Sequence, residues 1–186
     1  MSENKIDAQR LREHIGSLKC GDSVLLTGYI FTTRDAAHKR LFDMEGKGQP
    51  LPISFKDAII YYAGPTPERE GMAAGSCGPT TSGRMDAFTP RFIEMGLVGM
   101  IGKGKRSEAV VEAMKAHGCV YFGAIGGAGA LASKCIKSNE VIAFSDLGCE
   151  SLKRMYVEDF PLTVIIDSKG NDLYEVGRKN YLAGNF

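Results

Sequence analysis

The chain contains no tryptophan, no long hydrophobic run and no marked excess of one charge. Its 23 lysines and arginines face 22 acidic residues, so the overall charge favours neither a nucleic-acid nor a membrane partner. No apolar stretch approaches the roughly 18 residues of a membrane span, and residues 1–20 lack the apolar core of a signal peptide. We therefore expect a cytoplasmic protein with no membrane and no nucleic-acid partner.

The five cysteines also lack a recognisable pattern, because no two of them form a Cys-x-x-Cys pair. An odd number without close pairs fits reduced thiols better than a disulfide framework. A metal cluster site usually contains at least one close pair, so we expect small buried residues and no metal ligand in this chain. The cysteines are Cys20, Cys77, Cys119, Cys135 and Cys149.

Length and patterning favour one α/β domain. With 186 residues and 44% hydrophobic content, the chain fits a single unit over 1–186, with an N-terminal arm or helix at 1–20. Apolar runs alternate with helix-like stretches, which is typical of an α/β fold rather than a bundle or a sandwich. Strands are expected at 24–31, 97–101, 119–124, 141–144 and 162–167. Helices are expected at 35–42, 89–95 and 107–117, and another is expected to open at 126–130.

Arg34 is placed where a chemical site would be expected. It lies between the strand at 24–31 and the helix at 35–42, with Thr33 or Asp35 as the candidate helix cap. Such a junction exposes side chains and free N–H groups. His38 lies one helical turn further on and has two interpretations: it faces the same pocket, or it is a structural histidine, as lone histidines more often are.

The second candidate segment is GPTTSGRMD at 78–86, which follows an irregular Pro/Gly-dense loop at 64–79. Long loops in compact domains are usually functional or disordered. The segment joins the hydroxyls of Thr80 and Thr81 to the guanidinium of Arg84, and an arginine fork matches a carboxylate through two parallel hydrogen bonds. Two interpretations stay open, a carboxylate or phosphate site and a salt-bridged structural loop.

A third segment, GMIGKGKRS at 99–107, has the spacing of a phosphate-binding P-loop but fails at its last position. Arg106 stands where a serine or threonine would hold magnesium, which argues against nucleotide hydrolysis and a kinase-like enzyme. The glycines, the following helix and the cations Lys103, Lys105 and Arg106 are still consistent with an anion site, the alternative being a solvated basic turn. GAIGGAGA at 123–130 lacks the dinucleotide-binding order, and close helix packing explains its glycines.

Four segments carry a family resemblance. LLTGYIFTTRDAAHKRL, CGPTTSGRMD, GMIGKGKRS and VEDFPLTVIIDSKGNDLYE resemble, in order and spacing, the β subunit of the class I fumarase and L-tartrate dehydratase family. The resemblance covers most of the chain. It implies a swivelling β/β/α domain with a mixed sheet and flanking helices. It also implies a separate α subunit that carries three cysteines and a four-iron four-sulfur cluster, so that this chain alone is catalytically incomplete.

The resemblance also implies roles for individual residues. Arg34, Arg84 and Lys103 would contact the carboxylates of a C4 dicarboxylate, Thr80 would be the catalytic hydroxyl, and Thr81 would lie beside it and contact the substrate. The residues expected around them are Asp35, His38, Asp86 and Lys105. Fumarate hydrated to malate is the first candidate reaction, ahead of tartrate dehydrated to oxaloacetate or a methylated relative. The open iron of the partner's cluster would bind the substrate hydroxyl as a Lewis acid.

Several points stay open at the level of the sequence. Either Lys103 or Lys105 reaches the substrate, and we favour Lys103 because it directly follows Gly102. The group that activates Thr80 is expected to be an acid of the partner subunit. An isolated chain with an uncovered apolar face would form homo-oligomers. The alternative function is a non-catalytic anion-binding or interaction module.

Overall fold

One mixed sheet forms the frame of the molecule. A computed structural model describes residues 4–68, 70–124 and 129–182. Within them the strand order is β1-β2-β3-β4-β5-β7-β6, and β7 also pairs with β2. The strands are β1 (Asn4–Asp7), β2 (Ser23–Thr32), β3 (Ile59–Tyr61), β4 (Gly99–Gly102), β5 (Val120–Gly123), β6 (Ile136–Ala143) and β7 (Leu152–Ile166). Because β7 joins β5 to β2, the strands β2, β3, β4, β5 and β7 close into a ring.

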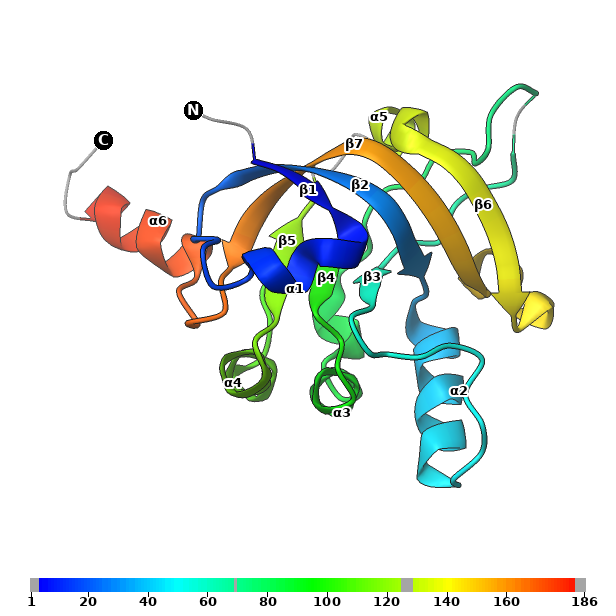
Figure 1. Cartoon of the computed structure of the whole chain (residues 1–186), viewed down its shortest axis with the longest axis horizontal. Coiled ribbons are helices and arrows are strands. Elements are labelled where there is room, and N and C mark those ends of the chain that lie inside the picture. Colours follow the sequence, from blue (N-terminus) through cyan, green and yellow to red (C-terminus); the bar gives the residue numbers. More distant parts are fainter. Residues whose placement is uncertain (1–3, 69, 125–128, 183–186) are drawn as a thin grey trace.

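Helices flank this sheet. They are α1 (Leu11–His14), α2 (Asp35–Gly46), α3 (Thr89–Glu94), α4 (Glu108–His117), α5 (Gly129–Cys135) and α6 (Leu173–Leu182), with short 3-10 helices η1 (Ala8–Arg10), η2 (Ser82–Met85) and η3 (Ser145–Glu150). Figure 1 shows β2 and β7 arching over β3, β4 and β5, while α2, α3 and α4 lie on the other side of those strands. A mixed sheet with flanking helices confirms the predicted α/β fold.

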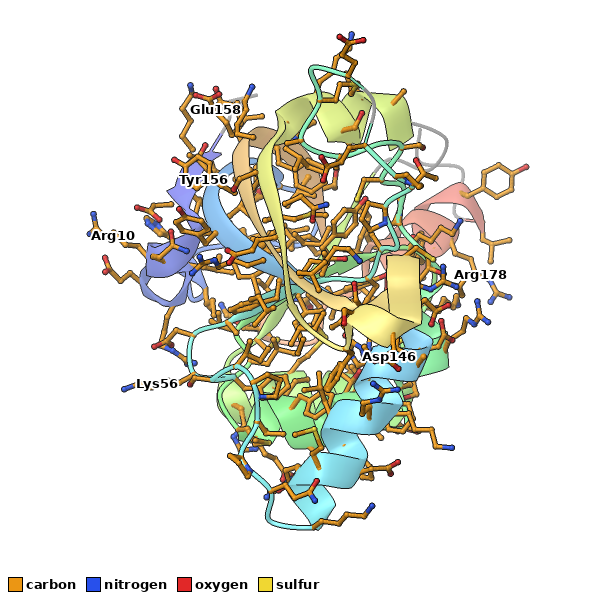
Figure 2. All side chains as sticks on the ribbon, turned by 90° about the vertical axis from the view of Figure 1, so that its right-hand side faces the viewer. Arg10, Lys56, Asp146, Tyr156, Glu158 and Arg178 are labelled. Atoms are coloured by element: carbon orange, nitrogen blue, oxygen red, sulfur yellow. The ribbon has the colours of Figure 1, made fainter. Side chains whose placement is uncertain are left out.

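The core has two parts because neighbouring residues of a strand point to opposite faces. Ile101 and Phe122 pack inside the ring, against the arching strands. Met100 and Tyr121, one position earlier on β4 and β5, pack in the second cluster with residues of α2, α3 and α4. All four side chains are fully buried. Figure 2 shows the labelled Lys56 projecting away from this packed interior.

Most expected elements are present, but the last strand is much longer than predicted. The strand expected at 162–167 extends from Leu152 to Ile166. Glu158 and Asp159 are both exposed, which interrupts the alternation of buried and exposed residues on which the prediction depended. Asp159 has a φ of 45°, and the register against β2 shifts between Leu26 and Gly28, so the strand passes this point through an irregularity.

The ends of other elements also differ from expectation. The strand expected at 141–144 begins earlier, as β6. Of the helix opening expected at 126–130, residues 126–128 lie outside the described residues, and α5 begins at Gly129. The N-terminal segment contains both forms considered for it, because β1 pairs in parallel with β2 and the short helix α1 buries Leu11 completely. In the described ranges no helix is long and apolar enough to span a membrane.

Candidate substrate site

Three parallel neighbours in the sheet bring the candidate residues to one edge. β2, β3 and β4 pair in parallel, so their carboxyl ends lie together. Arg34 follows β2, and Lys103 follows β4. The loop after β3 returns to the same edge, because the Thr80 N–H donates a hydrogen bond to the Tyr62 carbonyl (2.8 Å). Residues separated by up to 69 positions, from Arg34 to Lys103, thus lie at one edge of the sheet, beyond the carboxyl ends of its parallel strands.

A single carboxylate joins the two arginines. Asp35 Oδ1 forms an ion pair with the Arg84 Nε at 2.9 Å, and Asp35 Oδ2 accepts a hydrogen bond from the Arg34 Nε at 3.3 Å. Glu150 adds a second acidic contact to the Arg34 Nε at 3.4 Å. In both guanidiniums the ion-pair distance to the carboxylate is measured from Nε, and the terminal nitrogens donate no hydrogen bond to a described residue. Each arginine therefore keeps the fork that a carboxylate ligand would need.

The N-terminus of α2 is capped differently from the prediction. Neither Thr33 nor Asp35 is the cap; Arg34 occupies that position and makes no side-chain cap bond. Instead, the Glu150 carboxylate accepts from the Ala36 N–H (3.1 Å). Glu150 therefore fixes both the helix end and the arginine beside it.

The threonine pair is attached to the glycine turn that bears Lys103. Thr81 and Lys103 form a parallel bridge, and the Ser82 N–H donates to the Lys103 carbonyl at 2.9 Å. Thr80 is half-buried, whereas Thr81 and Lys103 are exposed. The structure thus places two hydroxyl groups and a lysine beside the arginine pair.

The two lysines of the turn differ in their contacts. The Lys105 ammonium forms an ion pair with Glu175 of α6 at 2.7 Å. The Lys103 ammonium makes no ion pair or hydrogen bond within the ranges that the structure describes. This difference supports Lys103 as the lysine that is available to a ligand.

Arg106 and Asp86 have a structural role beneath the site. The Arg106 side chain is 0% exposed and donates from Nε to Asp86 Oδ1 at 2.8 Å. It also donates to Thr89 Oγ1 (3.0 Å). The other Asp86 oxygen accepts from the Ser107 N–H at the start of α4 (2.5 Å). The expectation that Arg106 and the α4 N-terminus serve an anion site is therefore wrong, since a carboxylate of the chain itself occupies that position.

His38 lies in the buried core, among aromatic side chains, rather than in the open part of the candidate site. Its ring packs edge-on against Tyr62 (5.3 Å between centroids) and near Phe92 (5.5 Å). Burial, with a smaller contribution from the charge of Arg106, lowers the pKa of His38 to about 3. The structural interpretation of this histidine is the one that its surroundings support.

Four residues of the site were not found from the sequence. Glu150 contacts Arg34 from a position more than a hundred residues away, with no motif around it. Ser82 and Tyr121 form a buried hydroxyl pair at 2.9 Å under the turn. Ser82 lies inside the segment GPTTSGRMD, but the sequence pattern of that segment does not distinguish it from its neighbours. The structure explains why position 64 is a glycine, because a Cβ there would lie 3.1 Å from Arg34 Cδ.

The candidate site is an open cationic edge beside two hydroxyl groups, on a domain of the α/β class. The family model described as "Fumarase C-terminus" matches residues 1–177, and the chain belongs to that family. The chain is similar to two kinds of relatives, some much longer than this chain and one of similar length.

The long relatives are fumarate hydratases. "Fumarate hydratase 2" of Leishmania major is 42% identical over 176 residues, covering 91% of this chain and 31% of that protein. "Fumarate hydratase class I, aerobic" of Escherichia coli (strain K12) is 45% identical over 152 residues, covering 81% of this chain and 28% of that protein. The chain therefore spans less than a third of the length of either relative.

The short relative has the same extent as this chain. "Putative L(+)-tartrate dehydratase subunit beta" of Methanocaldococcus jannaschii is 36% identical over 177 residues, covering 91% of both chains. Members of the family thus include a separate chain of this size as well as a part of a longer one.

The buried histidine generates a prediction for the pH dependence of stability. His38 binds a proton below pH about 6.5 in the unfolded chain, but only below pH about 3 in the folded chain. The free energy of unfolding therefore falls as pH decreases through this window. From pH 7.5 to pH 5 we expect this residue to account for a loss of about 2 kcal/mol in the free energy of unfolding.

Urea unfolding at both pH values measures this loss. In His38→Phe, which keeps a ring of similar size, the pH-dependent loss should shrink by about that amount. His117→Phe, which replaces an exposed histidine in the last turn of α4, serves as the control and should unfold with the wild-type pH dependence. An equal pH dependence in wild type and His38→Phe would contradict the prediction.

Proposed function

We propose that this chain supplies the substrate-binding part of a hydro-lyase that reversibly adds water to a C4 dicarboxylate. Fumarate to malate is the first candidate reaction and tartrate to oxaloacetate the second, because the relatives carry these substrates in their names. One observation carries the proposal: the Asp35 carboxylate holds Arg34 and Arg84 together at the edge that also bears Thr80 and Lys103.

The paired arginines suit a substrate with two carboxylates. A guanidinium that is held through Nε can rotate little and offers its terminal nitrogens as a bidentate fork. Arg34 is 23% exposed and Arg84 55% exposed at the side chain, so both can be reached by a ligand. Asp35 lies between them and prevents the two positive charges from repelling each other when no substrate is bound.

The hydroxyls and Lys103 suit the chemistry of hydration. When water leaves malate, a proton is removed from the carbon next to one carboxylate and hydroxide leaves the neighbouring carbon. Negative charge builds on that carboxylate, where the cations of the site stabilise it. We assign the proton transfer at carbon to Thr80, with Thr81 beside it. A threonine hydroxyl is a weak base, so Thr80 must pass its own proton to a stronger base, which we place on the partner subunit.

The described part of this chain does not fit a metal cluster. Among the residues described, no three histidine, cysteine, aspartate or glutamate side chains converge. Burial raises the pKa of Cys77 and of Cys119 to about 12 each, which disfavours the thiolate form that a cluster requires. We therefore assign the four-iron four-sulfur cluster to an α subunit.

The open surface of the site supports a second subunit. Thr81, Arg84 and Lys103 face solvent, where water weakens every charge interaction with a substrate. A partner that covers this edge would exclude that water. Exposed apolar residues of α6, among them Val176 and Leu182, are consistent with the prediction that the isolated chain forms homo-oligomers.

Turnover measured without and with the partner tests the proposal. Under anaerobic conditions we expect no conversion of fumarate or tartrate by this chain alone, and conversion when the cluster-bearing α subunit is added. Loss of fumarate absorbance and formation of oxaloacetate from tartrate are the readouts. Turnover by the isolated chain would contradict the division of labour. Dicarboxylate binding without turnover in the assembled complex would favour the non-catalytic module.

The assignment of Thr80 predicts a loss of rate rather than of binding. In the assembled enzyme Thr80→Ala should lower kcat by about 100-fold or more, since general acid-base groups typically contribute this much. Thr81→Ser, which keeps the hydroxyl beside it, is the matched control and should stay within a few-fold of wild type. A Thr80→Ala enzyme within a few-fold of wild type would remove Thr80 from the proton transfer.

The two lysines provide a matched pair. Lys103→Met should reduce kcat/KM by about 10- to 100-fold, because it deletes a charge that contacts the substrate and keeps the length of the side chain. Lys105→Met should change kcat/KM by less than about threefold, because its ammonium is paired with Glu175. Steady-state kinetics of both variants decides between them, and the reverse order of effects would assign the contact to Lys105.

A further inference from the structure

Two buried hydroxyl groups connect the threonine segment to the turn that bears Lys103. The Ser82 Oγ accepts from the Lys103 N–H at 3.1 Å and lies 2.9 Å from the Tyr121 Oη. The Tyr121 hydroxyl donates to the Gly104 carbonyl at 3.0 Å. A chain of hydrogen bonds therefore leaves the turn at Lys103, passes through Ser82 and Tyr121, and returns to the turn one residue later.

The direction of every hydrogen bond in this chain is fixed. A carbonyl oxygen can only accept, so the single hydrogen of the Tyr121 hydroxyl goes to Gly104. The hydrogen between the two side chains must then come from Ser82, whose oxygen remains free to accept from the Lys103 N–H. Burial raises the pKa of the Tyr121 phenol, so that the donor keeps its hydrogen at neutral pH. Hydrogen bonds aligned in one direction strengthen one another.

The surroundings leave this chain of bonds little freedom. A Cβ on Gly102 would lie 1.9 Å from the Ser82 Oγ, so only glycine at this position lets the serine approach the turn. The Arg106 guanidinium lies 5.1 Å from the centre of the Tyr121 ring and is itself held by Asp86. Both Ser82 and Tyr121 are fully buried. Arg106 thus packs against the ring of Tyr121, while the Tyr121 hydroxyl reaches the carbonyl of Gly104 in the turn.

We propose that Ser82 and Tyr121 are positioning residues that fix the Lys103 backbone relative to the Thr80–Thr81 pair. A lysine side chain is flexible, so the place from which it starts decides where its ammonium can reach. Ser82 binds both backbone polar groups of Lys103: its N–H donates to the Lys103 carbonyl, and its Oγ accepts from the Lys103 N–H. The inference deepens the proposed function and depends on it, because the lysine must contact substrate for its position to affect turnover.

A double-mutant cycle in the assembled enzyme tests whether Tyr121 acts through Lys103. Tyr121→Phe removes the hydroxyl and keeps the buried ring, and we expect kcat/KM to fall about tenfold. In a Lys103→Met background the same change should cost less than about twofold, because the lysine that it positions is absent. An equal loss in both backgrounds would overturn the proposal, since a general structural defect does not depend on Lys103.

Tyr61→Phe is the matched control for this cycle. It also deletes a buried phenol hydroxyl that donates to a carbonyl, that of Cys77 (2.6 Å). Whatever its effect on kcat/KM, that effect should be the same with Lys103 and with Met at position 103. Coupling as strong as that of Tyr121 would show that the cycle does not isolate the Ser82–Tyr121 connection, and this outcome would count against the proposal.

Amide hydrogen exchange of the full chain separates this inference from the proposed function. Ser82→Ala and Tyr121→Phe should each accelerate exchange at the Lys103 N–H by about tenfold or more, while the Val98 N–H, bonded to the Ala58 carbonyl, exchanges as in wild type. Unchanged exchange at Lys103 overturns the inference even if the enzyme is active. Accelerated exchange together with full activity of Lys103→Met overturns the substrate role of Lys103 and leaves the backbone contact established.

Discussion

The antiparallel pairing of β2 with β7 is the interaction on which the architecture depends. It extends from Ser23 to Thr32 along β2 and closes the sheet by linking β2 to the strand that also pairs with β5 and β6. Closure leaves β2, β3 and β4 parallel and in fixed register, so that their carboxyl ends form one edge. The arginine, the threonines and the lysine are each delivered to that edge by a different strand or by the loop that returns to it.

Charge is distributed in two layers at this edge. The upper layer contains the exposed Arg84 and Lys103 and the half-buried Arg34, with Asp35 between the arginines. The lower layer contains the buried Arg106, which is neutralised by Asp86. An unpaired buried charge would cost several kcal/mol, so this pair must remain intact. The positive charge beneath the site also helps to keep His38 uncharged. The cations of the upper layer are those that we propose for the substrate, while the buried Arg106 holds the loops in place.

Short-range signals made much of the fold predictable. Predominantly apolar runs located β2, β4 and β5, and helical composition after Arg34 located α2. β7 was underestimated because a pair of exposed acidic residues and a proline interrupt its pattern, whereas its pairing with β2 on one side and β6 on the other maintains the strand. Arg106 was misjudged for a related reason. A basic residue in a glycine-rich turn normally faces solvent, and only the packing of Asp86, Tyr62 and Tyr121 explains its burial.

The sequence by itself determined which chemical groups are present and in which segments, because hydroxyls, guanidiniums and glycines occur there in an order that is specific to one family. The tertiary structure decided which of these groups are available. It paired Lys105 with Glu175 and buried Arg106, and it left Lys103 exposed. It also brought Glu150 to Arg34 and Tyr121 to Ser82. These contacts join residues that are far apart along the chain, and no local pattern encodes them because they arise only when the ring of strands closes.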